Sequence, residues 1–105
     1  MAYLLQVDFP YAGPWGAEMA AGMTELAHSI AAEPGLIWKL WTENPAAGEA
    51  GGIYLFQEQA QAEAYLAMHT ARLKQFGLSR INGKIFAVNE TLSRLTRWPG
   101  SVHAG

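Results

Sequence analysis

The chain has 105 residues, of which half are hydrophobic and 15% are charged, and its formal net charge is -2. This length suits one domain and is too short for two domains with separate cores. The slightly negative charge, with no run of Lys or Arg, gives no general attraction to nucleic acid or to an anionic membrane. The absence of cysteine excludes disulfides, thiolate catalysis and cysteine-bound metal. The N-terminus lacks a basic region followed by a long apolar stretch, and no apolar stretch approaches the ~20 residues of a membrane span, so we expect a cytoplasmic protein.

The first part of the chain reads as strand, helix and strand. Residues Tyr3 to Phe9 predict a strand, because apolar side chains flank two polar ones. A helix is expected from Trp15 to about Ala32, since apolar residues recur at helical spacing on one face. Pro34 and Gly35 then end this helix, and Leu36 to Glu43 predict a second strand. The apolar residues of the first helix are Met19, Met23, Leu26, Ala27 and Ile30.

The second part repeats this order after a hairpin. Turn residues from Asn44 to Glu49 predict a loop, and Ile53 to Gln57 a third strand. A second helix is expected from Glu58 to Phe76, with Gly77 as its C-terminal stop, and a fourth strand from Lys84 to Asn89. We expect one domain over residues 1–98 and a flexible tail over residues 99–105. The apolar stripe of the second helix comprises Ala62, Tyr65, Leu66, His69, Leu73 and Phe76.

The order β-α-β-β-α-β predicts an α+β fold of the ferredoxin-like kind, with a four-stranded antiparallel sheet and both helices on one face. The strands themselves are apolar on both faces, as in Ile53–Phe56 and Ile85–Val88. Two helices cover only one face, and the other would remain as a large exposed apolar patch. We therefore expect a homodimer in which the two sheets pack against each other.

His69 is the titratable residue of most interest, because it falls in the middle of the apolar stripe of the second helix. An imidazole aimed between helix and sheet could act as a base or hold a ligand hydroxyl. The alternative is a core histidine that hydrogen-bonds a backbone carbonyl. Arg72 lies at the edge of the same stripe, next to Tyr65, and could neutralise an anionic ligand or remain solvated.

Trp38, Trp41 and Tyr54 form a second candidate group. Trp38 and Trp41 are three residues apart on one strand, so they face opposite sides of the sheet, and the sequence does not say which one faces the helices. Large aromatic side chains with a polar tip suit a pocket for a flat ligand, although they are also ordinary core and interface residues. The histidines show no metal-ligand spacing and no nucleotide-binding loop is present, so we expect no metal and no organic cofactor.

Three long segments and a short one carry a resemblance to a known family. The segments Glu33–Glu43, Glu49–Phe56 and Tyr65–Lys74, with Val88-Asn89-Glu90 and the following Leu92-Ser93, resemble the YdhR family of monooxygenases, and the likeness extends over nearly the whole chain to about Ser93. The resemblance implies the dimeric α/β-barrel superfamily. Relatives there include monooxygenases that oxidise polycyclic phenols with molecular oxygen and without a cofactor, and monooxygenases that degrade haem.

For this chain the resemblance implies oxidation of a small phenolic or polycyclic aromatic compound in a pocket between helices and sheet. His69 would be the base or hydroxyl partner, and Arg72 would steady developing negative charge. The aromatic ring would be held by Trp38 or Trp41, Tyr54 and Tyr65. One alternative is a non-catalytic dimeric module that binds a small aromatic or lipid-like molecule in the same cleft. Another is haem degradation, but the Asn-Trp-His set of those relatives is incomplete here. The first strand offers Gln6 and no asparagine, and Phe56 stands toward the end of the third strand, where no tryptophan occurs.

Overall fold

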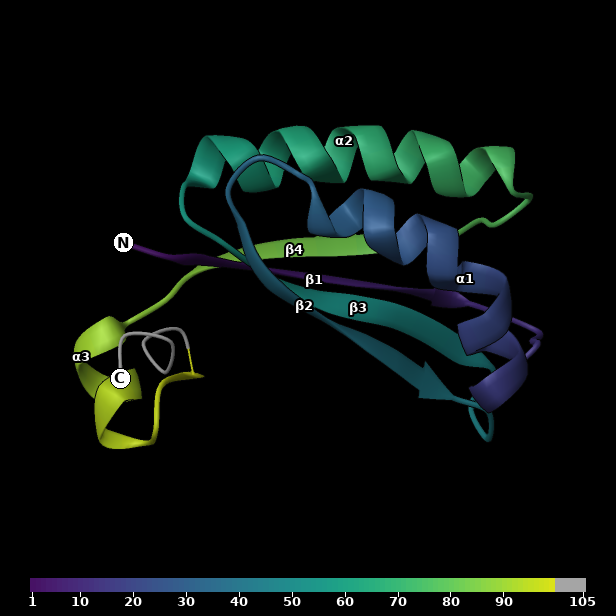
Figure 1. The fold of residues 1–105 in the computed structure, drawn as a ribbon, viewed down its shortest axis with the longest axis horizontal. Helices are drawn as coiled ribbons and strands as arrows, with labels where there is room; N and C mark the ends of the chain where they lie inside the picture. Colours follow the sequence, from purple (N-terminus) through teal and green to yellow (C-terminus); the bar gives the residue numbers. More distant parts are fainter. Residues whose placement is uncertain (100–105) are drawn as a thin grey trace.

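The computed structural model describes residues 1–99. The chain forms one antiparallel sheet with two long helices and a short third helix (Figure 1). The expected tail falls almost entirely outside the described residues. In chain order the elements are β1 (Tyr3–Pro10), α1 (Gly16–Ala31), β2 (Leu36–Asn44), β3 (Glu49–Phe56), α2 (Gln59–Gln75), β4 (Asn82–Ala87) and α3 (Glu90–Leu95).

The four strands lie in the order β2-β3-β1-β4, and every neighbouring pair is antiparallel. Both α1 and α2 cover the same face of the sheet, as Figure 1 shows. This is the ferredoxin-like α+β arrangement, and the sequence-based expectation of the fold is confirmed.

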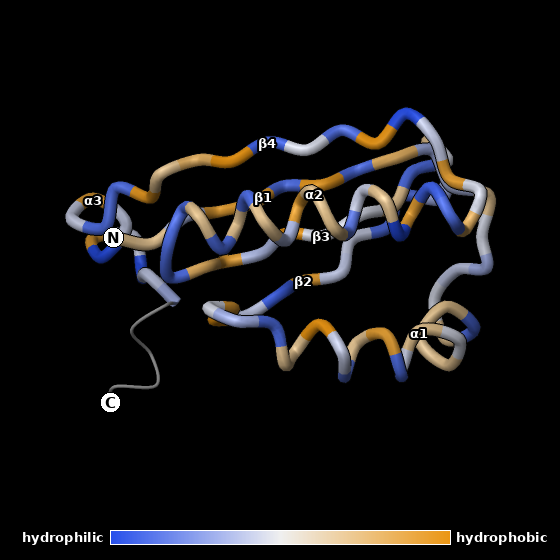
Figure 2. The backbone as a smooth tube through the Cα atoms, turned by 90° about the horizontal axis from the view of Figure 1, so that it is seen from above, coloured by the Kyte–Doolittle hydropathy of each residue, from blue (hydrophilic) through white to orange (hydrophobic). Residues whose placement is uncertain are grey.

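The two helices cover different strands. Helix α2 packs on β1, β3 and β4, whereas α1 packs on β2, and in Figure 2 the helices run well apart over the sheet. The start of α1 is fastened to the far end of β2, because the Glu43 carboxylate accepts a hydrogen bond from the Gly16 backbone N–H at 2.9 Å. The start of α2 is held by a capping box between Glu58 and Gln61. Side chains of both helices and of the sheet line one cavity between them.

The core lies between this sheet face and the helices. It contains alternate residues of β1 and β3, because side chains of a strand alternate between its two faces, together with the inward residues of the helices. Its buried members are Leu5, Val7, Phe9, Met19, Ile30, Ala50, Tyr54, Phe56, Ala62, Tyr65 and Leu73. The stripe expected on α2 is largely confirmed, although Phe76, which caps the helix, is 59% exposed.

Two strands and one short helix differ from the sequence-based expectation. Strand β3 begins at Glu49 rather than Ile53, because a tight turn over residues 45–48 returns the chain directly into the ladder with β1 and β2. Strand β4 is displaced by two residues toward the N-terminus. Helix α3 was not expected, and its start is explained by Asn89, whose side chain accepts a hydrogen bond from the Leu92 backbone N–H.

The sheet face opposite α1 and α2 carries apolar side chains that reach solvent. By register, Leu40 pairs with Ile53, Trp38 with Leu55 and Leu4 with Phe86 on this face, where Leu55 itself is fully buried. Leu40 is 58% exposed and Phe86 is 48% exposed.

Within residues 1–99, no helix is long and apolar enough to cross a membrane.

Candidate functional site

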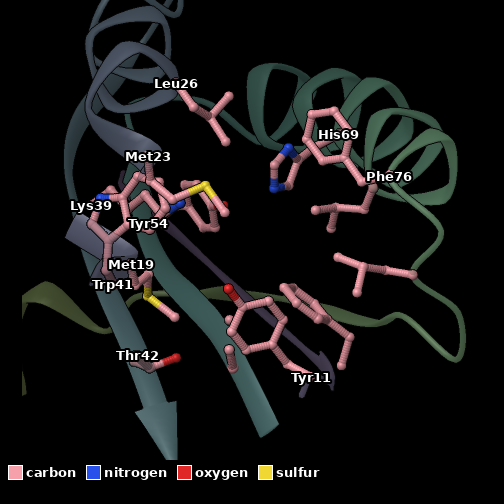
Figure 3. A pocket seen from close by; sticks show the side chains of 15 residues that line it. Tyr11, Met19, Met23, Leu26, Lys39, Trp41, Thr42, Tyr54, His69 and Phe76 are labelled. Atoms are coloured by element: carbon pink, nitrogen blue, oxygen red, sulfur yellow. The ribbon is translucent and has the colours of Figure 1, made fainter. Parts of the chain in front are cut away.

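A cavity of about 50 Å³ lies between the two helices and the sheet (Figure 3). Its wall is mostly apolar and comes from β1, α1, β2, β3 and the end of α2. A second, wider hollow of about 410 Å³ lies beside it along α1, and the two share Met19, Met23 and Trp41 as a common wall. The residues that line the first cavity are Phe9, Tyr11, Met19, Met23, Leu26, Lys39, Trp41, Thr42, Ala50, Gly51, Tyr54, His69, Leu73, Phe76 and Leu78.

His69 projects from α2 toward this cavity and is only 3% exposed. Its Nδ1 atom is contacted by two Arg72 nitrogens, Nε at 3.2 Å and Nη2 at 2.9 Å. A guanidinium has only donors, so Nδ1 must accept, and the ring proton of the neutral imidazole is therefore on Nε2. Nε2 makes no hydrogen bond within residues 1–99, and it is not among the fully enclosed unpartnered atoms. The site thus presents a hydrogen-bond donor to the cavity.

The environment of His69 keeps its ring neutral. Burial, followed by the positive charges of Arg72 and Lys39, lowers the pKa of His69 from 6.5 to about 3. The ring stacks on Tyr65 at 5.0 Å between centroids and meets the edge of Tyr54 at 6.2 Å. At neutral pH His69 is therefore a rigidly oriented neutral donor.

A line of hydroxyls extends this arrangement into the core. Arg72 Nη2 donates to the Tyr65 hydroxyl at 3.4 Å, and that hydroxyl donates to the Tyr54 hydroxyl, also at 3.4 Å. Burial raises the pKa of both phenols, so they stay protonated at neutral pH. Arg72 therefore orients two partners at once, the His69 ring and the Tyr65 hydroxyl.

Lys39 enters the cavity from β2. Its Nζ atom lies 3.4 Å from the ring centroid of Trp41 and 4.6 Å from that of Tyr54. Burial, with a further contribution from the Arg72 charge, lowers the pKa of Lys39 from 10.5 to about 7. Its amine is thus divided between neutral and charged forms at neutral pH.

The lysine stem occupies space left by a glycine of the neighbouring strand. A Cβ atom added to Gly52 would stand 2.7 Å from the Lys39 Cε atom and 3.1 Å from Tyr54. The missing side chain at Gly52 therefore lets the Lys39 stem lie flat across β3.

The structure brings together three of the side chains expected at the site. Trp41, Tyr54 and His69 all line the cavity, whereas Trp38 belongs to the opposite sheet face. This answers which tryptophan faces the helices: it is Trp41. The other two expected residues, Tyr65 and Arg72, lie behind the wall and position its members instead of lining it.

Sequence reasoning missed Lys39 altogether. The signal was present in the two-residue spacing of Lys39 and Trp41, which puts both on the same face of β2. A lysine on a strand is ordinarily solvent-facing, so the spacing alone did not single it out.

Within residues 1–99, no group of three or more His, Asp or Glu side chains is arranged to hold a metal ion.

The chain matches one known protein family and shares its fold with several solved structures. The family described as "Putative mono-oxygenase ydhR" matches residues 4–99. No curated protein matches the chain. Among solved structures, a variant of SnoaB, a cofactor-independent oxygenase from Streptomyces nogalater, is similar with a TM-score of 0.59 and 16% identity over 84% of this chain and 93% of that one.

Two further solved structures share the fold. A protein of unknown function from Nitrosomonas europaea has a TM-score of 0.58 and 20% identity over 84% of this chain and 89% of its own. A protein from Chloroflexus aurantiacus described as a "putative Antibiotic biosynthesis monooxygenase" has a TM-score of 0.50 and 12% identity, over 85% of this chain and 96% of its own. At these identities the likeness concerns the fold alone.

Proposed function

Because this chain belongs to the YdhR family, described as mono-oxygenases, we propose that it oxidises a small phenolic or polycyclic aromatic compound with molecular oxygen in the cavity beside His69. No metal or organic cofactor takes part in the proposed reaction. In the simplest case a phenol and one O2 give a quinone and one water. One oxygen atom becomes the second carbonyl, the other leaves as water with two substrate hydrogens, and the substrate supplies all four electrons.

The observation that carries this proposal is the His69 Nε2–H group directed into an apolar cavity. A phenol oxygen that accepts this hydrogen bond gains electron density as it loses its proton, and a neutral fixed donor stabilises the resulting oxyanion. Arg72 positions the imidazole from behind, and its charge stabilises the same oxyanion at longer range. Tyr54 and Trp41 supply flat apolar walls for the ring.

The space available sets how the substrate enters. A cavity of about 50 Å³ is smaller than the ~150 Å³ that holds a benzene molecule. Met19 and Met23 line both this cavity and the hollow of about 410 Å³ beside it, and we propose that rotation of these unbranched side chains joins the two. We therefore place the reacting oxygen next to His69 and the remainder of the aromatic system along α1.

Oxygen uptake with a panel of one-ring and two-ring phenols tests this function. With oxygen-18 gas we expect one labelled oxygen in the product and one in water per substrate consumed, with no added reductant. Saturable binding of the same phenols without oxygen uptake would instead support the non-catalytic binding module.

The exposed apolar sheet face supports a further part of the proposal, a homodimer. Leu40 and Phe86 lie on the sheet face away from α1 and α2, and a second copy packed sheet to sheet would cover both. Gln6 also lies on that face by register, away from the cavity, which disfavours the haem-degrading alternative for this site.

A further inference from the structure

The site has an excess of positive charge. Lys39 lines the cavity and Arg72 lies directly behind His69, yet no Asp or Glu lines this cavity, and Glu43 lines only the adjoining hollow. The ion pairs within residues 1–99 lie elsewhere, where Glu90 meets the N-terminal amine and Arg94. Lys39 and Arg72 are both half-buried, and a partly desolvated cation without a counter-ion is costly, so such an arrangement favours either loss of a proton or an anionic ligand.

Lys39 has no partner of its own in the described part of the chain. No hydrogen bond or ion pair to Nζ is formed there, and the atom is not fully enclosed. Its stem is held across Gly52 and its amine lies against the faces of Trp41 and Tyr54. Those rings leave the amine without a hydrogen-bond acceptor, but they stabilise its charged form through cation–π contacts.

We propose that Lys39 is the proton acceptor of this site and that the cavity selects aromatic compounds with an acidic hydroxyl, which bind as the oxyanion between Lys39 and His69. This inference rests on the proposed function. In the step itself the substrate O–H bond breaks and its electron pair stays on oxygen. The Nζ lone pair takes the proton, giving a phenolate and an ammonium with no change in oxidation state.

The groups that face Lys39 assign the acceptor role to it and not to its neighbours. From α2, His69 offers only a donor, because its Nδ1 lone pair is occupied by Arg72, and the Arg72 guanidinium itself has only donors. From β3 and α2, burial raises the pKa of the phenols Tyr54 and Tyr65, so neither is an acceptor at neutral pH. Helix α1 contributes only uncharged side chains, Met19, Met23 and Leu26.

The titration of Lys39 fits this role. Its pKa of about 7 leaves a large neutral fraction in the resting site, and the charge of a bound oxyanion would then raise that pKa and hold the transferred proton. An ordinary lysine would be charged already and could not accept a proton at neutral pH.

Two probes separate charge from shape: 2-naphthol, which ionises, and its methyl ether 2-methoxynaphthalene, which does not. At pH 8 free naphthol is neutral, since simple phenols ionise near pH 10. With the wild-type protein we expect the long-wavelength absorption of naphtholate in the complex, and binding at least about ten-fold tighter than that of the ether. Calorimetry in buffers of different ionisation heat should register no net proton release, because Lys39 takes the proton.

Two variants and one control complete the experiment. Lys39→Met should lose the naphtholate band and about ten-fold or more in naphthol affinity while binding the ether unchanged. Lys39→Arg keeps the charge but cannot accept a proton, so it should bind naphthol with release of about one proton to the buffer. Lys74→Met, which removes an exposed lysine from α2, should behave as wild type.

The proposal would be overturned if the wild type bound naphthol no better than its ether, or if naphthol stayed neutral when bound. It would also be overturned if the Lys39→Met variant bound naphthol as the wild type does, or if the Lys39→Arg variant released no proton on binding. These readouts need no oxygen. Tight naphtholate binding without oxygen uptake would therefore leave the Lys39 assignment standing and refute the monooxygenase function, and oxygen uptake with an unaffected Lys39→Met variant would do the reverse.

Discussion

Replacing Lys39 by Met should change how the stability of the protein depends on pH. The pKa of Lys39 is about 7 in the folded protein and near 10.5 in the unfolded chain. Between these values the unfolded state binds one more proton, so the wild type gains stability as pH rises, at about 1.4 kcal/mol per unit, and this contribution is fully lost below pH 7. The Met variant lacks this dependence. From pH 7.5 to 9.5 the free energy of unfolding should shift in favour of the wild type by up to about 2.5 kcal/mol relative to the variant.

Urea unfolding followed by tryptophan fluorescence at half-unit pH steps measures this difference. The range stops at pH 9.5 because the buried phenols Tyr54 and Tyr65 have raised pKa values, which lower stability at higher pH in both proteins. Lys74→Met serves as the control, and it should give curves parallel to the wild type. Parallel curves for Lys39→Met as well, within about 0.5 kcal/mol, would show that Lys39 titrates as an exposed lysine and would remove the physical basis of its assigned role.

Three further predictions concern the arginine, the second sheet face and bound cofactors. Arg72→Met should raise the pKa of His69 toward 6.5, because one of the two nearby positive charges is removed. NMR titration of the imidazole protons measures this pKa, and an unchanged value would show that burial alone lowers it. Leu40→Asp should convert the proposed homodimer to monomer by light scattering, whereas Met68→Asp, at an exposed position of α2, should not; a wild type that is itself monomeric at micromolar concentration refutes the dimer. Elemental analysis and absorption spectra of the purified protein should reveal no stoichiometric metal, flavin or haem, and one equivalent of any of them would contradict the proposed chemistry.

The fold was predictable because its signals are local. The helix periodicity, the Pro34-Gly35 stop and the Asn44–Glu49 hairpin each act within a few residues, and their order leaves few topologies. The errors arose where a boundary depends on contacts across the sheet. Strand β3 extends back to Glu49 because β1 and β2 flank it on both sides, which a single strand's composition does not reveal.

The site was predictable only in part, for a related reason. His69 stood out as one polar residue in an apolar stripe, whereas Lys39 became visible only when Gly52, Trp41 and Tyr54 were seen to enclose its stem. A register shift between Leu36 and Trp38 also sets which face each tryptophan takes, and only the paired strand shows it. Burial of an amine depends on residues far apart in the sequence, so spacing along one strand could not supply it.

His69→Leu tests whether the imidazole is used or merely tolerated. Leucine fills similar volume in an apolar stripe, so the variant should fold, and it removes a group whose pKa falls from 6.5 to about 3 on folding. The unfolded wild type binds a proton below pH 6.5 that the folded protein does not, so wild-type stability is lost as pH falls, by about 1.4 kcal/mol per unit. As pH falls from 7 to 5, the free energy of unfolding of the wild type should therefore decrease relative to that of the Leu variant in urea unfolding.

Binding then separates structure from function. If the Nε2–H group holds the substrate oxygen, His69→Leu should lower 2-naphthol affinity by about ten-fold or more and change 2-methoxynaphthalene affinity far less, since a hydrogen bond to a charged group contributes about 1.5–3 kcal/mol. His69→Gln, whose amide also offers an N–H donor, should recover part of the loss. A histidine that serves only the fold would show the same stability profile with pH but leave naphthol affinity unchanged in both variants. That result would mean that the bound oxyanion does not contact His69 of α2. The proposed site, in which the oxyanion lies between Lys39 and the His69 donor, would then be wrong.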